Sequence, residues 1–200
     1  MKHNFINISK RLSMAALAAT MVAAPAINVF AAPEDIIDTS KTASLTIHKY
    51  DMTAAAEDGV DINQFKANGK QDSAAEAQMA KYKIKGVEFT YQKVGDICTE
   101  SVGGDIKVMY DIPAELEKIL GLTDSRGDHK HTSDEINGAM KNILTSNTES
   151  KNKLEDYIKS GHGQTSMPLT DDNGVSTASS LPLGLYLIVE TKVPANVHTT

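Results

Sequence analysis

Within its 200 residues the chain has one cysteine, no tryptophan and only 5% aromatic residues. A single thiol, Cys98, cannot form an internal disulfide and cannot supply a four-thiolate zinc site. The scarcity of aromatic rings argues against a large stacking platform. Lys and Arg number 20 against 26 Asp and Glu, so there is no basic excess to attract nucleic acid. What remains is an acidic, disulfide-free chain whose 40% hydrophobic content suffices for a core.

Motifs of common catalytic and metal sites are also missing or weak. No GxSxG, HExxH or phosphate-loop pattern occurs. The segment 128–131, DHKH, could bind a metal, but two His at this spacing lack a rigid scaffold, so a solvated loop is favoured. The segment 171–174, DDNG, starts like a calcium loop without the Glu that such a loop needs, which favours a hairpin turn. We therefore expect no metal and no cofactor.

The N-terminal residues 1–31 have the pattern of a cleaved export signal. Three cations, Lys2, Lys10 and Arg11, precede an uncharged stretch rich in Ala, Met and Val that ends at Ala31. A transmembrane anchor is the alternative, but the apolar stretch is short for a full span. Cleavage after Ala31 would remove three cations and no acid, which moves the formal charge from −6 to −9. We expect an exported protein that begins at residue 32.

Three segments of the mature chain alternate in the manner of β-strands: 44–50, 86–94 and 185–191. The last of these is the most apolar, and it carries apolar side chains on both faces, which predicts a central strand covered on both sides. Weaker strand signals lie at 106–110 and 175–179, and turns are expected at 103–104, 171–174 and 181–184.

Between the strands, the hydrophobic period changes to that of helices. Helices are predicted at 113–120, 133–145 and 148–160, and a capping box at Thr132 to Glu135 opens the second of them. Residues 51–83 are predicted to be a polar insertion with a short helical patch around 73–81. We infer one domain, 32–200, that is mainly β, with a helical insertion packed outside the strands.

Two charged residues fall on strand faces that a sandwich would bury. Lys49 shares its face with Leu45 and Ile47, and Glu190 shares its face with Tyr186 and Ile188. A buried ammonium is costly unless it is paired or neutral. A neutral Lys beside a protonated Glu would combine a nucleophile with a proton donor. The alternative is that each lies at a strand end and reaches water.

These strand segments resemble the N-terminal domain of Gram-positive major (backbone) pilins, the shaft subunits of sortase-assembled pili. The resemblance rests on 45–50 (LTIHKY), on 86–94 (GVEFTYQKV) and on 181–194 (LPLGLYLIVETKVP). The last segment is the most specific, because it matches the glutamate-containing box Gly-x-Tyr-x-x-x-Glu-Thr-x-x-Pro of such domains. The resemblance covers nearly the whole mature chain.

The resemblance implies an immunoglobulin-like (CnaB/pilin-type) β-sandwich with an intramolecular Lys–Asn isopeptide bond. Lys49 would supply the amine of that bond, and Glu190 would be the assisting acid. The family's Tyr-Pro-Lys motif and LPxTG-type sorting signal are not found in these residues, and the family places the Asn partner on the domain's last strand. Asn196 is too close to Glu190 along the chain to be that partner. We therefore expect the Asn partner and the pilin-motif Lys beyond residue 200, in a longer protein.

The resemblance makes a structural pilus subunit, not an enzyme, the leading functional prediction. Its expected partners are neighbouring pilin subunits, a pilin-specific sortase and host surface molecules, and its expected location is the cell wall of a Gram-positive bacterium. An adhesin module of the same sandwich fold, which would bind a host protein or glycan, is the first alternative. A secreted enzyme that uses Glu190 or the His pair is the second, and it would require a concave pocket with converging polar groups.

Overall fold

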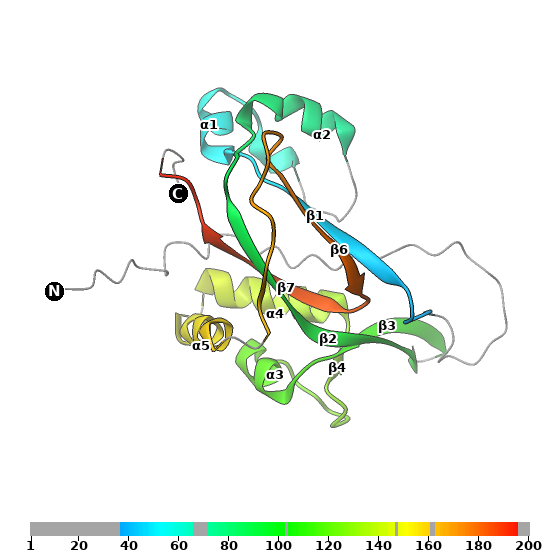
Figure 1. Cartoon of the computed structure of the whole chain (residues 1–200). Coiled ribbons are helices and arrows are strands. Elements are labelled where there is room, and N and C mark those ends of the chain that lie inside the picture. Colours follow the sequence, from blue (N-terminus) through cyan, green and yellow to red (C-terminus); the bar gives the residue numbers. More distant parts are fainter. Residues whose placement is uncertain (1–36, 66–71, 103, 147, 161–162, 196–200) are drawn as a thin grey trace.

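The computed structural model of the chain describes residues 37–65, 72–102, 104–146, 148–160 and 163–195 (Figure 1). The predicted export signal, residues 1–31, lies outside the described residues, as does Asn196. Export and cleavage after Ala31 therefore stay predictions.

The smaller of two antiparallel sheets pairs the first strand with one late in the chain. In it, β1 (Thr42–His48) runs against β6 (Val175–Pro182). The register places Leu45 opposite Ala178, with an irregularity between Ala43 and Leu45. Side chains of β1 alternate between exposed and at least partly buried positions, as a strand with one covered face requires.

The larger sheet is built around the long strand β2 (Glu88–Val102). Its first half pairs with β7 (Leu185–Lys192) and, at two residues on the other side, with β5 (Thr165–Ser166). Its second half pairs with β3 (Asp105–Asp111), which in turn pairs with the two-residue strand β4 (Lys130–His131). The strand β2 thus changes partners near Gly95, where the β7 register ends and the β3 register begins.

The two sheets face each other across one apolar core, which makes the fold a β-sandwich. Leu45 of β1 and Leu181 of β6 pack there with Phe89 of β2 and with Tyr186 and Ile188 of β7. Burial of these side chains supplies the main attraction between the sheets. The predicted β-sandwich is confirmed. Helices and strands each contain 34% of the described residues.

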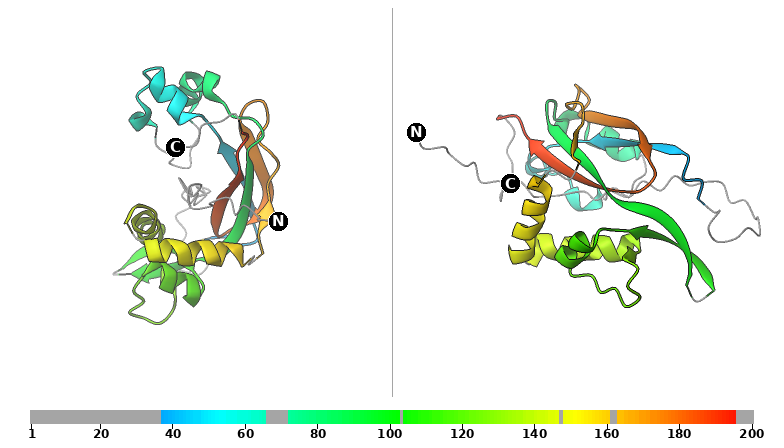
Figure 2. Two further views of the ribbon diagram at one scale, coloured as in Figure 1. Left: turned by 90° about the vertical axis from the view of Figure 1, so that its left-hand side faces the viewer. Right: turned by 60° about the horizontal axis from the view of Figure 1, so that its bottom comes forward.

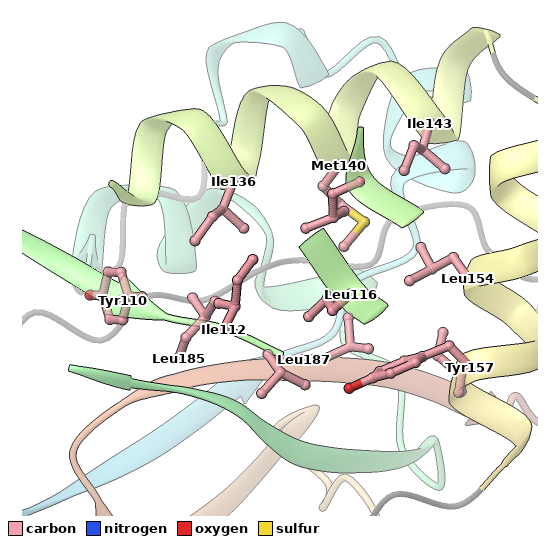
Figure 3. Close-up of a cluster of buried hydrophobic side chains, with 13 residues drawn as sticks. Tyr110, Ile112, Leu116, Ile136, Met140, Ile143, Leu154, Tyr157, Leu185 and Leu187 are labelled. Atoms are coloured by element: carbon pink, nitrogen blue, oxygen red, sulfur yellow. The ribbon is translucent and has the colours of Figure 1, made fainter. Parts of the chain in front are cut away.

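A second core covers the opposite face of β7. Three helices form it: α3 (Ala114–Leu120), α4 (Ser133–Ser146) and α5 (Thr148–Lys159). Leu185 and Leu187 of β7 meet side chains of all three helices and of the segment after β3 (Figure 3). These partners include Ile112, Leu116, Ile136, Met140, Ile143, Leu154 and Tyr157. Because β7 is buried on both faces, the prediction of a strand covered on both sides is confirmed. The predicted central position is wrong, because among the described strands β7 pairs with β2 alone.

Local signals in the sequence define where these helices begin and end. The Thr132 amide N–H donates to Glu135 Oε2 at 2.8 Å, and the Glu135 amide N–H donates back to Thr132 Oγ1 at 3.3 Å. This is the predicted capping box at the start of α4. Helix α3 ends at Gly121, whose φ of 66° belongs to the left-handed region that closes helices.

A small helical lobe follows β1. It contains α1 (Met52–Glu57), the 3-10 turns η3 (Ile62–Gln64) and η4 (Ala80–Tyr82), and α2 (Ser73–Gln78). Ala55, Met79 and Tyr82 form its separate core. Figure 2 shows this lobe and the α3–α5 helices at opposite ends of the strands. The helical patch expected around 73–81 is therefore present, whereas α1 had not been predicted.

Several predicted boundaries are wrong by a few residues. The first strand ends at His48 rather than at residue 50, so Lys49 stands just beyond it. Cys98 lies inside β2 rather than after it, because β2 continues through its pairing with β3. The turn expected at 181–184 is confined to residues 183–184, because Leu181 and Pro182 still pair with β1.

Candidate cross-linking site

Lys49 is placed by backbone contacts on both sides of its peptide unit. Its amide N–H donates to the Gly174 carbonyl at 2.8 Å, and its own carbonyl accepts the Ile84 amide N–H at 3.1 Å. The Lys49 side chain keeps the parity of Leu45 and Ile47, which point toward the core between the sheets. Lys49 therefore extends the inner face of β1 by one position.

The turn that holds Lys49 is the predicted Asp171–Gly174 turn. The Gly174 amide donates to the Asp171 carbonyl at 2.9 Å, and Asp171 Oδ1 accepts the amides of Asn173 and Val175. Gly174 has a φ of 70°, and a Cβ there would lie 2.6 Å from the Lys49 carbonyl oxygen. Only glycine fits at this position, because a side chain would strain the backbone and displace Lys49.

Glu190 is positioned by β7. It pairs opposite Phe89 of β2 and shares its strand face with Tyr186 and Ile188, both of which lie in the core between the sheets. Tyr186 is fixed further by its hydroxyl, which donates to the Pro182 carbonyl at 2.7 Å. The carboxylate of Glu190 thus projects from the inner face of the larger sheet near its end.

The structure brings these two predicted residues into direct contact. Lys49 Nζ lies 2.5 Å from Glu190 Oε2, and the two side chains are 27% and 14% exposed. The contact joins the end of β1 to the end of β7, across the space between the two sheets. In its burial, this contact is intermediate between a surface ion pair and a fully buried one. A surface pair contributes little to stability, whereas a fully buried pair is costly to break.

The chemistry open to this pair follows from its contact distance. Transfer of a proton from the Lys49 ammonium to the Glu190 carboxylate would leave a neutral amine and a carboxylic acid at hydrogen-bond distance. A neutral amine is a nucleophile toward a carboxamide carbon, and a carboxylic acid can donate a proton to the carbonyl oxygen or to the leaving nitrogen. The pair therefore has the two groups that an amide-exchange reaction needs.

The predicted DHKH loop has a different structure from the solvated loop that the sequence favours. His131 is 4% exposed, and its Nε2 lies 2.6 Å from Glu117 Oε1. His129 Nδ1 lies 2.9 Å from Glu117 Oε2 and 3.5 Å from Asp124 Oδ2. Glu117 comes from α3, so the loop is anchored to a helix through two imidazole contacts. The sequence separation of these residues is why their spacing did not reveal the cluster.

The contacts within this cluster shift the titration of its members. The hydrogen bond with Glu117 raises the pKa of His129 above its usual value. Burial works to raise the pKa of Glu117, but the hydrogen bonds from His131 and His129 outweigh it, and the pKa of Glu117 is lowered. The backbone N–H of His129 lowers the pKa of Asp124. All three shifts favour the charged form of each group.

The surroundings of Cys98 do not activate it, because burial outweighs the charge of Lys130. Burial raises the pKa of its thiol, which is the opposite of what a reactive thiolate requires. Its thiol donates to the Met109 carbonyl at 3.7 Å, across the β2–β3 ladder. Cys98 is therefore a structural residue of this ladder.

Comparison with known protein families identifies the fold. The family model that describes the N-terminal domain of Gram-positive pilin subunit D1 matches residues 40–200. Searches of curated proteins and of solved structures returned no match. None of the described helices has the length and apolar character needed to cross a membrane.

The matched range contains both Lys49 and Glu190, and the family is one of structural subunits rather than of enzymes. The chain therefore belongs to the family of N-terminal domains of Gram-positive pilin subunits, and its role is that of a subunit of a cell-surface pilus that assembles with other pilin subunits.

Proposed function

We propose that the chain is the N-terminal part of a shaft subunit in a covalently assembled pilus, and that Lys49, assisted by Glu190, forms an intramolecular isopeptide bond with an asparagine. The observation that carries this proposal is the 2.5 Å contact between Lys49 Nζ and Glu190 Oε2. The amine and the carboxylate come from facing sheets and are partly buried beside an apolar core. Burial of charged groups costs free energy, so such a pair is unusual unless it serves a reaction. The family membership supports the same assignment.

The reaction is a condensation in which atoms and charges balance. Lys49 first gives a proton to Glu190, and its neutral nitrogen then attacks the carboxamide carbon of an asparagine. Protonated Glu190 polarises the carbonyl oxygen by hydrogen bonding and gives its proton to the departing nitrogen, and its carboxylate then takes the second proton from the Lys49 nitrogen. One C–N bond forms, one C–N bond breaks, and ammonia leaves. The partner asparagine is expected on the strand that follows residue 200 in the longer protein.

This bond would stabilise a domain that has no disulfide within these residues. Without the asparagine, Lys49 and Glu190 contact each other only through an ion pair. With it, β1 would be joined covalently to a strand beside β7. We further propose that a pilin-specific sortase links such subunits end to end and that host surface molecules are contacted by the finished pilus on the cell wall.

The test is intact-mass spectrometry of the full-length natural protein after export. The isopeptide bond predicts a mass about 17 Da below the calculated value of the cleaved chain, from the loss of one ammonia. Lys49→Ala and Glu190→Ala should each abolish this deficit. Lys85→Ala is the matched control, because Lys85 also forms a 2.6 Å ion pair, with Asp172, but is largely exposed.

Peptide mapping of the same material locates the bond. A cross-linked peptide that contains Lys49 and a downstream asparagine supports the proposal. A full-length protein with no deficit, or with a deficit that persists in Lys49→Ala, would show that Lys49 is only a paired lysine at a strand end. Subunit polymers that resist boiling in detergent, seen only when the sortase is present, would test the shaft assignment separately.

A further inference from the structure

A second group of functional side chains lies on the other side of β7, where α3 meets the edge of the larger sheet. It consists of Glu117 from α3, Asp124 from the loop after α3, His129 just before β4, and His131 within β4. We call these four residues the α3–β4 cluster. The cross-linking chemistry proposed above uses none of them.

Three atoms of the α3–β4 cluster converge on one point. Glu117 Oε2, Asp124 Oδ2 and His129 Nδ1 are the three groups whose ligand atoms all lie within 4.8 Å of one another. The separations recorded with His129 Nδ1 are 2.9 Å to Glu117 and 3.5 Å to Asp124. Ligand atoms about 2.0–2.2 Å from one zinc ion in tetrahedral geometry are separated by about 3.3–3.6 Å. The cluster is therefore already close to the spacing that a single ion requires.

Each carboxylate is held in place by contacts that leave an oxygen facing this point. Asp124 Oδ1 accepts the amides of Arg126 and Gly127 at 2.9 and 2.7 Å, and Oδ2 accepts the His129 amide. Glu117 is oriented through its other oxygen, which accepts from His131 Nε2 at 2.6 Å. Outer hydrogen bonds of this kind orient the ligands of protein metal sites. His131 is thus a positioning residue for Glu117.

The charge of the neighbourhood also suits a cation. The side chains of Glu117 and Asp124 are only 11% and 9% exposed, so two carboxylates lie close together with little access to water. The nearby cations are engaged with other acids: Arg126 pairs with Glu100 and Asp128, and Lys130 pairs with Glu100. The carboxylates of Glu117 and Asp124 together carry two negative charges, which a divalent ion would neutralise.

We propose that Glu117, Asp124 and His129 bind one divalent transition-metal ion of the zinc class, with His131 as the positioning residue. An imidazole nitrogen among the ligands favours zinc or its neighbours over calcium or magnesium, which prefer oxygen ligands. The His129 side chain is 43% exposed, which leaves a fourth coordination position open to water. The ion replaces the proton on His129 Nδ1, which is released to water, and the hydrogen bond between His129 Nδ1 and Glu117 is lost.

Such an ion would tie α3 to the loop before β4 and to the edge of the larger sheet. The contacts between these elements are now hydrogen bonds from imidazoles. A ligand that binds only the folded state stabilises it in proportion to the logarithm of its concentration over its dissociation constant. The melting temperature of the protein should therefore rise with zinc concentration.

The experiment is a titration of the full natural chain, freed of metal with a chelator, with zinc chloride in a calorimeter. A saturable site with one ion per chain is expected, and cobalt(II) bound in its place should give the visible absorption of tetrahedral coordination. Because the sequence contains six histidines, variants decide where the ion binds. His129→Ala should remove this site. His131→Ala should weaken it about 10–100-fold, and His131→Gln, which keeps an N–H donor, should restore part of the affinity.

His48→Ala is the matched control, because His48 also faces a carboxylate, Glu76, at 3.8 Å but lies in the other part of the molecule. It should bind zinc as the unchanged protein does. Zinc binding that survives in His129→Ala would place the ion elsewhere and overturn the proposal. No saturable binding, or an equal loss of melting temperature in His129→Ala with and without zinc, would show that the α3–β4 cluster is a hydrogen-bonded network only.

Discussion

The burial of β7 on both faces makes a prediction about two adjacent residues. Leu187 points into the helical core and Ile188 into the core between the sheets, and they are 2% and 4% exposed. Leu187→Ala and Ile188→Ala should therefore both destabilise the protein strongly. In a sheet with one face in water, one of two neighbouring positions on a strand would be tolerant.

The magnitude follows from the groups removed. Each substitution deletes three carbon groups, which at about 0.8 kcal/mol each accounts for about 2.4 kcal/mol of lost transfer free energy. A residual cavity of several tens of Å³ would add about 1 kcal/mol or more, at about 24 cal/mol per Å³. We expect each variant to lower the free energy of unfolding by about 3–4 kcal/mol.

Equilibrium unfolding in urea measures both effects through the shift of the transition midpoint at constant slope. Lys192→Ala, at the exposed end of the same strand, is the control and should change the free energy by less than about 0.5 kcal/mol. A cost below about 1 kcal/mol for either core variant would mean that the corresponding face of β7 is not covered. That result would refute the two-core description of the fold.

Four further predictions concern single contacts. Thr132→Ala removes one half of the capping box and should cost about 1 kcal/mol in thermal or urea unfolding; a neutral result would contradict the cap. The Thr132 backbone N–H lowers the pKa of Glu135 from its ordinary 4.5, so this stabilisation is present above pH 4.5 and is lost as the pH falls through the folded-state pKa. Glu135→Gln should remove that part of the acid dependence, and an unchanged pH profile of stability would count against it. Gly174→Ala forces a side chain into a left-handed position against the Lys49 carbonyl; it should cost about 2 kcal/mol or more, and a melting temperature like that of the unchanged protein would disprove the close approach. Lys49→Met and Glu190→Gln, combined in a double-mutant cycle on this 200-residue chain, should give a coupling energy of about 1–3 kcal/mol, between the values for exposed and buried pairs; a coupling near zero would show that the contact does not contribute in solution.

The sequence predicts the sandwich strands well because burial dictates their residues. In β1 and β7, each residue that faces a core is apolar until Lys49 and Glu190, so parity alone placed both charged side chains on inner faces. The helices were predicted from caps that act within one turn, such as the box at Thr132 and the glycine at position 121. In these cases the local signal and the tertiary packing agree.

The second half of β2 could not be predicted from the alternation of polar and apolar residues. Residues 96–102 leave the sandwich and pair only with β3. Side chains of residues 96–101 are mostly part-exposed on both faces, so burial imposes no alternation of polar and apolar residues. The helix α1 was missed because six residues give too short a period, although Asp51 caps it through the Ala54 amide at 2.9 Å.

The sequence singled out the residues of one proposed site but not those of the other. Lys49 and Glu190 could be singled out because each is an exception within a regular pattern. The α3–β4 cluster could not be predicted from the sequence. Glu117 belongs to an amphipathic helix, where a Glu is ordinary, and it contacts the two His only because the fold brings α3 and β4 together. Chemistry that depends on contacts between separate elements leaves no spacing to detect.

The two proposed stabilising features adjoin different cores. The Lys49–Glu190 pair closes the core between the sheets, and the α3–β4 cluster lies beside the helical core. These two cores share β7, whose alternate side chains belong to one core or the other. Neither core can therefore lose its packing without exposing a face of the strand that completes the other. The proposed cross-link or the proposed ion, although each adjoins only one core, would therefore stabilise both cores.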